Sequence, residues 1–242
     1  ILAGLASLAV VGNYTYFGVT RATATFPGDW PLVFACGVVG GAFGAVFSSL
    51  VLWITRRIRR WRAHDPFGRA LLVAGCAGLL VAVVGVTCGG STYGTGYGEA
   101  RGAIEGTQLP TLYFLAKFAV TLASTVSGIP GGLFAPSLSV GAGLGSTIGM
   151  ALESDIGLAA ILGMAGYFAG VVQAPMTAFV IILEMTGNHD NVIPLMAASM
   201  LGYGTARLIS REPLYHALSR LFIADELRRS RVETPPAERQ PT

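Results

Sequence analysis

A short glycine- and proline-containing run, residues 131–136 (GGLFAP), has the residue types needed to hold an anion with backbone amides. Glycine lets the backbone approach an ion without interference from a Cβ atom, and proline is tolerated in the first helical turn. The first N–H groups of a helix have no partner within it and together carry roughly half a positive charge. The sequence therefore predicts anion binding at the amides of Leu133 and Phe134. The residues expected to support them are Gly131, Gly132 and Pro136.

This motif lies between two apolar segments rather than at an aqueous edge, so it predicts a helix interrupted at membrane depth. Moving a bare ion into a medium of dielectric constant about 4 costs tens of kcal/mol, and the protein must therefore replace the water around the ion. Helix N-termini are a milder partner than a full cation, and they become available at depth when helices are broken.

Composition indicates that lipid is the solvent for the elements that position this motif. Of 242 residues, 52% are hydrophobic and 12% are charged, whereas a soluble domain carries roughly 25% charged residues. The 33 glycines suit close helix packing and broken helices in membranes. We expect an all-α, polytopic membrane bundle with broken and re-entrant helices.

Apolar runs of helical length recur along the chain, and a bilayer core about 30 Å thick needs roughly 20 such residues. Breaks are expected at the glycine-rich stretch 88–98, at residues 127–132 (SGIPGG) and at residues 173–175 (QAP). The number of crossings stays open. The expected helices are Ile1–Val11, Trp30–Ile54, Ala70–Val86, Leu112–Ser127, Leu133–Leu152, Gly157–Val172, Met176–Leu183, Val192–Ile209 and Pro213–Ile223.

The net charge of +3 is local, because nine of the sixteen basic residues lie in two clusters, Arg56–Arg62 and Arg220–Arg231. Such clusters are typical of cytoplasmic edges of membrane segments, so we expect a cytoplasmic C-terminus. Residues 1–225 are expected to form the transmembrane domain, and residues 226–242 a basic, then Pro- and Glu-rich disordered tail. The charge spacing gives no reason to expect nucleic-acid binding.

The segment GGLFAPSLSVGAGLG resembles the GxFxP anion-filter segment of the CLC chloride channels and chloride/proton antiporters. The resemblance continues in register through GMAGYFAGVVQAPMTAFVIILEMTGN, VIPLMAASMLGYGTAR and EPLYHAL. It is strong over residues 120–225, whereas residues 1–110 match mainly in the order and length of spans.

The resemblance implies chloride as the bound and transported ion, held by the amides at Leu133 and Phe134 and by the hydroxyl of Tyr215. It also implies a homodimer through Ile1–Val11, Met176–Leu183 and Val192–Ile209. The family's first half carries a GSGIP-type serine filter, a GxEGP-type gating glutamate and an internal proton glutamate, and none of these motifs is present in the sequence. We therefore expect the second inverted repeat plus one preceding helix, which needs the other half for a complete pathway. Channel and proton-coupled antiporter stay open.

Simpler interpretations compete for individual residues. Phe134 alone would more often pack than bind, and Tyr215 alone would suit an interfacial aromatic belt. Glu184 has a functional interpretation as a carboxylate near a span, but a structural role at a helix end is favoured. Lys117, in an apolar span, could attract anions, or it could snorkel or pair with a carboxylate. Ser127 belongs to the lead-in to the filter and is not expected to bind the ion.

Enzyme function is not expected, and neither are a metal site or a cofactor. The three histidines, His64, His189 and His216, are scattered without a metal-binding spacing, and the three cysteines show no paired spacing. No GxSxG or phosphate-binding loop is present in the sequence. The alternatives to anion transport are another class of secondary transporter and, less favoured, an intramembrane enzyme.

Overall fold

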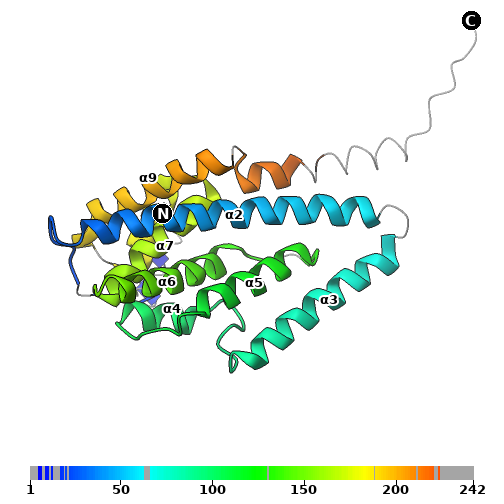
Figure 1. The fold of residues 1–242 in the computed structure, drawn as a ribbon, viewed down its shortest axis with the longest axis horizontal. Helices are drawn as coiled ribbons and strands as arrows, with labels where there is room; N and C mark the ends of the chain where they lie inside the picture. The colour runs from blue at the N-terminus through cyan, green and yellow to red at the C-terminus, as the bar shows by residue number, and fades with distance from the viewer. Residues whose placement is uncertain are drawn as a thin grey trace, which may run out of the picture.

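The computed structural model describes residues 5–6, 9–10, 12, 17–18, 20, 22–62, 66–129, 131–187, 189–210, 212–220 and 223. Over these residues the chain is helical and contains no strand, which confirms the predicted all-α bundle (Figure 1). The helices are α2 (Trp30–Arg62), α3 (Pro66–Thr87), α4 (Tyr97–Ile104), α5 (Tyr113–Val126), α6 (Phe134–Ala151), α7 (Ile156–Val172), α8 (Pro175–Thr186), the 3-10 turn η1 (His189–Asn191) and α9 (Val192–Ile209). A further helical stretch covers residues 214–220.

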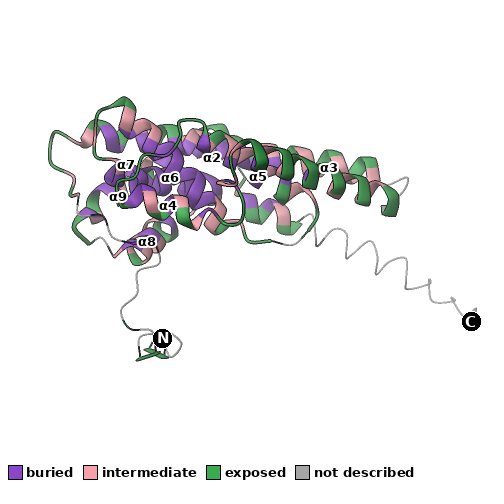
Figure 2. Ribbon diagram, turned by 90° about the horizontal axis from the view of Figure 1, so that it is seen from below, coloured by how far each residue is buried: buried purple, intermediate pink, exposed green. Residues whose placement is uncertain are grey.

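Helix α7 lies at the centre of the bundle, packed against α6, α2 and α9 (Figure 1). Its sequence is apolar all round, which is typical of a helix that has no face toward solvent. The Asp155 carboxylate caps its N-terminus by accepting a hydrogen bond of 2.8 Å from the amide of Leu158. Nearly every residue of α7 is buried (purple in Figure 2).

Glycines let the backbones of these central helices approach closely. A Cβ atom at Gly163 of α7 would lie 2.5 Å from the Cα atom of Gly145 on α6. A Cβ atom at Gly170 would lie 2.8 Å from the Cα atom of Gly41 on α2. Both distances are too short for a real side chain, so α7 is held between its neighbours by backbone packing.

The predicted break after α7 is confirmed. Gln173 ends the helix with a φ of 56°, and Pro175 is the first residue of α8. The Gln173 side chain donates a hydrogen bond of 2.8 Å from Nε2 to the carbonyl oxygen of Ser210, beyond the end of α9. Side-chain bonding of this kind re-satisfies backbone groups where helices are interrupted within a membrane protein.

Within the described residues, three helical segments are long and apolar enough to cross a bilayer, namely Trp30–Arg62, Phe67–Thr87 and His189–Ile209. Three shorter apolar helices, α5, α7 and α8, have 14, 17 and 12 residues. At about 1.5 Å per residue, even α7 is only about 25 Å long, less than the hydrocarbon core. Long spans and short half-spans together fit the expected mixture of continuous and broken helices.

Helix α2 differs from the prediction that a span ends at the arginine cluster, because it continues through Arg56 to Arg62. Arginine is a good helix former, and a helix that has left the hydrocarbon can continue in water. Helix α4 was not expected, since its eight residues are short and of mixed polarity. Most of the expected helix Ile1–Val11 and the whole tail 226–242 lie outside the described residues.

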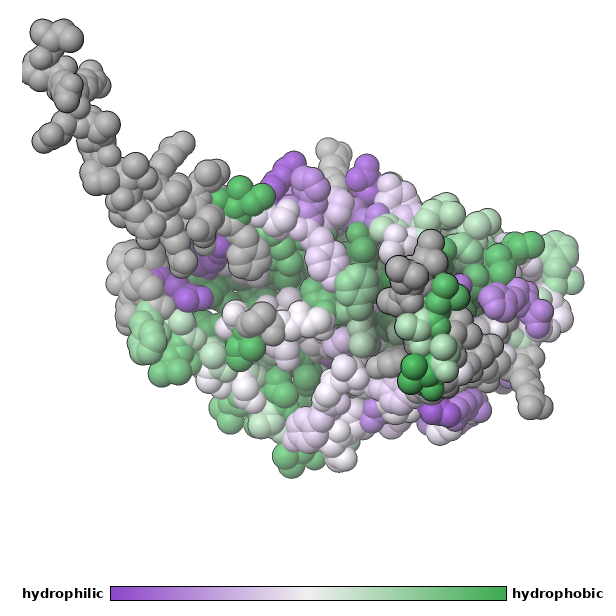
Figure 3. Space-filling model, turned by 180° about the vertical axis from the view of Figure 1, so that it is seen from behind, coloured by the Kyte–Doolittle hydropathy of each residue, from purple (hydrophilic) through white to green (hydrophobic). Residues whose placement is uncertain are grey.

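Helix α3 is the least covered span. Only 11% of its apolar window is buried, against 56% for α2, and it is mostly green in Figure 2. In Figure 1 its first residues lie near the end of α2, and the two helices then diverge. The space-filling view has apolar or weakly polar side chains over most of its middle, with hydrophilic ones mainly toward the edges (Figure 3).

Candidate functional site

The chain reverses between α5 and α6 through a turn that begins at Ser127. The Ser127 hydroxyl donates to the carbonyl oxygen of Ser124 (2.7 Å) and accepts from the amide of Ile129 (3.2 Å). Gly128 has a φ of 87°, a backbone conformation that favours glycine. Ser127 therefore serves the turn, in agreement with its exclusion from the predicted ligands.

The amides at the start of α6 are open. Leu133 is the N-cap residue, and no side chain caps the helix. The first helical hydrogen bond runs from the amide of Ser137 to the carbonyl oxygen of Leu133, at 3.1 Å. Within the described part of the chain, no group accepts a hydrogen bond from the amide of Leu133 or Phe134. These two N–H groups are thus available to an anion, and the helix dipole favours negative charge there.

The predicted supporting residues lie around these amides. Gly131 and Gly132 are exposed, and a Cβ atom added at either would meet no atom within 4 Å. Pro136 is the third residue of α6, within its first turn, where an amide hydrogen would have had no helical partner. The glycines thus leave the approach to the α6 N-terminus uncovered by side chains.

Tyr215 reaches this N-terminus from a distant part of the sequence. Its ring stacks on that of Phe134, with centroids 5.9 Å apart and an interplanar angle of 24°. The Phe134 ring also contacts that of Phe168 on α7, with ring centroids 5.1 Å apart and an interplanar angle of 56°. Phe134 and Tyr215 are 43% and 38% exposed, so neither ring is enclosed in the core. The structure therefore brings the ring of Tyr215 into contact with the side chain of Phe134, the second residue whose amide is predicted to bind the ion.

Lys117 follows neither the snorkelling nor the ion-pair interpretation offered for it. Its side chain is 1% exposed, and Nζ donates hydrogen bonds of 2.8 Å to the carbonyl oxygens of Thr92 and Gly94. Lys117 therefore neither snorkels to an aqueous edge nor forms an ion pair with any carboxylate in the described ranges. It fastens the glycine-rich connection between α3 and α4 to α5.

Sequence reasoning missed the hydroxyl network beside this lysine. Ser139 Oγ on α6 donates a hydrogen bond of 3.1 Å to the carbonyl oxygen of Gly96, and it lies 2.6 Å from the hydroxyl of Tyr113 on α5. The only sequence signal was a lone lysine in an apolar run near a glycine-rich stretch. Nothing in that pattern indicated which carbonyls it would meet.

The remaining candidates lie on the surface. Glu184, His189 and His216 are exposed, and His64 lies outside the described residues. No group of three metal-ligating side chains gathers anywhere in the portion of the chain that the structure describes.

A profile of the family described as "Voltage gated chloride channel" matches residues 1–207. Similar curated proteins include the H(+)/Cl(-) exchange transporter ClcA of Yersinia pestis bv. Antiqua (strain Angola), 31% identical over 85% of this chain and 45% of its own length. The protein of the same name from Klebsiella pneumoniae is 30% identical over 87% of this chain and 46% of its own length. The chain thus spans about half the length of the curated relatives it matches.

Solved structures with the same fold include a CLC-type fluoride/proton antiporter, with a TM-score of 0.70, 21% identity, and coverage of 82% of this chain and 49% of the other. A slow cyanobacterial Cl-/H+ antiporter gives a TM-score of 0.69 and 21% identity, with 92% of this chain and 54% of the other covered. The profile includes the first third of the chain, where the resemblance was weakest in sequence, and extends into the last turn of α9. By the extent of that match, the chain belongs to the voltage-gated chloride channel family, a family of integral membrane proteins.

Proposed function

We propose that this chain forms part of a transmembrane pathway for chloride or similar small anions, with an ion held at the N-terminus of α6. The observation that carries the proposal is the position of Tyr215, whose ring stacks on that of Phe134, at a helix start where the amides of Leu133 and Phe134 have no acceptor among the described residues. The curated relatives named above are described as H(+)/Cl(-) exchange transporters, which supports chloride as the ion.

The proposed ligands suit transport because they bind weakly enough to release the ion. Two amides and a phenol hydroxyl are neutral donors, and the helix end adds only roughly half a positive charge. Such donors replace part of the hydration shell without the strong attraction of a full cation, and conduction requires both entry and exit. Gly131 and Gly132 leave room at the helix start for an ion to approach.

We further propose that the protein works as a homodimer through α8 and α9. Exposed apolar side chains follow one another at helical spacing on both helices, and the two helices pack side by side. These side chains are Met176 and Val180 on α8 and Ile193, Met196 and Met200 on α9. In this proposal the arginine-rich end of α2 and the C-terminus face the cytoplasm.

The test is chloride binding and flux of the full-length protein carrying Tyr215→Phe. This substitution keeps the ring that stacks on Phe134 and removes only the hydroxyl. Because a hydrogen bond to a charged partner contributes about 1.5 kcal/mol or more, chloride affinity measured by titration calorimetry should fall about tenfold. Tyr203→Phe on α9, whose ring faces Arg207, is the matched control and should bind chloride as the parent does. Equal chloride affinity in the two variants would contradict the proposed site.

Flux from liposomes separates the functional classes. Chloride efflux accompanied by opposed proton movement indicates an antiporter, whereas chloride efflux without it indicates a channel. Transport of a cation or an organic solute in place of chloride would instead favour another class of secondary transporter.

A further inference from the structure

In the segment that joins α2 to α3, arginines far outnumber acidic residues. Residues 56–69 contain six arginines and one acidic residue, Asp65. Five of the arginines lie on the last turns of α2, and Arg69 lies in the first turns of α3. A helix end with this charge attracts anions strongly, especially at the surface of a membrane.

A cavity of about 660 Å³ lies between these two helix ends. Its described lining contains no acidic residue and consists of Arg57, Ile58, Arg60, Trp61, Arg69 and Val73. Arg69 is fixed against α2, because its guanidinium carbon lies 4.9 Å from the centroid of the Trp61 ring and its Nη1 donates to the Trp61 carbonyl oxygen. Arg57 and Arg60 of α2 and Arg69 of α3 therefore line one cavity from two helices.

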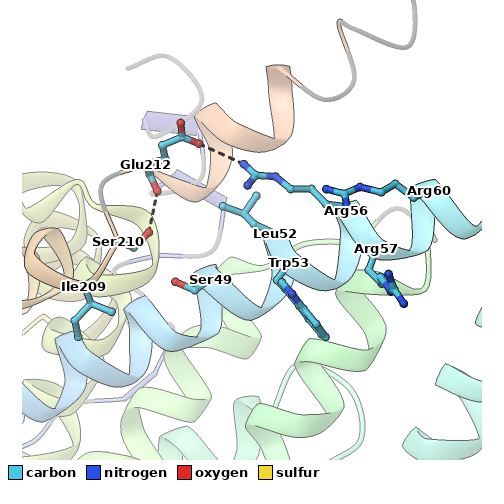
Figure 4. A pocket seen from close by; sticks show the side chains of 9 residues that line it. All are labelled: Ser49, Leu52, Trp53, Arg56, Arg57, Arg60, Ile209, Ser210 and Glu212. Atoms are coloured by element: carbon cyan, nitrogen blue, oxygen red, sulfur yellow. Dashed lines mark hydrogen bonds and ion pairs between the residues drawn. The ribbon is translucent and has the colours of Figure 1, made fainter.

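A second cavity of about 660 Å³ shares Arg57 and Arg60 in its lining and differs in containing a carboxylate. There Arg56 Nη2 lies 3.5 Å from Glu212 Oε2, and Glu212 also lies 3.9 Å from Arg220. Figure 4 shows Arg56 reaching toward Glu212, whereas Arg57 projects from α2 away from that carboxylate. Arg57 and Arg60 have no ion-pair partner in the described ranges. An anion is thus favoured in the cavity between α2 and α3.

The surroundings of that cavity select a lipid rather than a free anion. Trp61 is 43% exposed at the cavity, and tryptophan is enriched where membrane meets water. Beyond Val73, α3 continues as a helix whose apolar side chains are largely uncovered, among them Leu79, Leu80 and Val83. A small inorganic anion would use the arginines alone, whereas a lipid would also cover the adjoining apolar surface of α3.

We propose that the cavity between the end of α2 and the start of α3 binds an anionic phospholipid, with its phosphate held by Arg57, Arg60 and Arg69 and its acyl chains lying along α3. The site lies apart from the α6 N-terminus, and its occupancy does not depend on which ion the protein transports.

Native mass spectrometry of the detergent-purified protein tests this proposal with phosphatidylglycerol, phosphatidylcholine and glycerol phosphate as probes. Phosphatidylglycerol should bind the parent more tightly than phosphatidylcholine of the same chain length. Each arginine near a membrane anion contributes about fivefold in affinity, so the Arg57→Gln/Arg60→Gln variant should lose about 25-fold. Arg56→Gln removes the same charge from a residue already paired with Glu212, and it should bind phosphatidylglycerol as the parent does.

Two further arms keep the result interpretable. The Arg57→Lys/Arg60→Lys variant keeps the charge and should retain most of the binding, which separates loss of charge from loss of folding. Val73→Trp fills the cavity without changing charge and should weaken phosphatidylglycerol binding. Equal losses in the Arg56→Gln and Arg57→Gln/Arg60→Gln variants would overturn the proposal, since the attraction would then be a property of the whole cluster. Competition by glycerol phosphate at the affinity of the lipid would also overturn it, because the site would then be one for free phosphates.

Discussion

The cation buried in α5 is the only lysine of the chain, and its hydrogen bonds go to backbone carbonyls of another segment. Burial of an ammonium group is costly unless its protons find acceptors, and the carbonyls of Thr92 and Gly94 supply two of them. Because these carbonyls belong to the connection between α3 and α4, Lys117 couples that connection to the helix preceding the α6 motif. The residue therefore has a structural role, holding this connection against α5.

Replacing this lysine by methionine should loosen the fold measurably. Lys117→Met keeps an unbranched side chain, shorter by the terminal nitrogen, but leaves two carbonyl oxygens without their donor, at an expected loss of about 2 to 4 kcal/mol in the free energy of unfolding. The melting temperature of the purified protein in detergent measures the effect. Thr125→Val on the same helix removes a hydroxyl bonded only within α5, to the carbonyl oxygen of Thr121. If Lys117→Met melted at the temperature of this control, the fastening role would be wrong.

At the same scale, sequence reasoning found the residues of the proposed anion site but could not position them all. The local chemistry of GGLFAP was sufficient to predict open amides at Leu133 and Phe134. The contact of Tyr215 with Phe134 joins residues 81 positions apart along the chain, and no local pattern encodes such a contact. It was expected only from the resemblance to the chloride channel family. The partners of Lys117 are 25 and 23 positions away along the chain, also beyond any local pattern, which is why they were missed.

Glycine has two different uses among the helices, and these predict opposite outcomes for the same substitution. Gly163→Ala places a methyl group against the backbone of α6, where the Cα atom of Gly145 would be 2.5 Å away. Overpacking of this kind costs about 1 to 3 kcal/mol, so the melting temperature should fall. The Cβ atom that Gly132→Ala adds would have no atom within 4 Å. Its melting temperature should change by the equivalent of about 0.5 kcal/mol or less.

Chloride binding then separates the two glycines in the other direction. The methyl group of Gly132→Ala would stand at the start of α6, where the proposed ion approaches, so chloride affinity should fall while stability is kept. A Gly132→Ala variant that melts early would place this glycine in packing rather than in the anion approach. A Gly163→Ala variant that melts with the parent would show that α6 and α7 can separate at little cost.

The order of the elements was predictable because local residue types, such as glycine and proline, determine where helices break. Gly128 and Pro175 mark real interruptions, and the helices between the breaks agree with the expected spans to within a few residues at most ends. The predicted end of α2 was wrong, because the apolar run ends at Ile54 whereas the helix continues to Arg62. Helix α4 was not predicted because eight residues of mixed polarity show no apolar periodicity. Its buried residues, such as Ala100 and Ile104, are covered by other elements rather than by lipid.

At the scale of the whole molecule, apolar side chains are exposed on several of the described helices, and we assign different occupants to two such surfaces, one on α3 and one on α8 and α9. The α3 surface adjoins the arginine-rich cavity and faces lipid in the proposal above. The surface on α8 and α9 contains Ile193 and Met200, which are 65% and 45% exposed, and no cluster of cations borders it among the described residues. A second copy of the chain can cover it through a two-fold axis, because the same surface then serves both subunits.

Cysteine cross-linking distinguishes these occupants within one protein. Cys76 lies exposed on α3, whereas Cys36 is buried. In a background with Cys76→Ser and Cys88→Ser, Met196→Cys should give covalent dimers with a short bifunctional maleimide in liposomes, because Met196 lies within the proposed interface. Native Cys76, kept as the accessible thiol with Cys88→Ser, is the control, and it should remain monomeric because lipid separates the α3 surfaces of two copies. Dimers from Cys76 and none from the Met196→Cys variant would reverse the assignment, placing the subunit contact on α3 and leaving α8 and α9 to lipid.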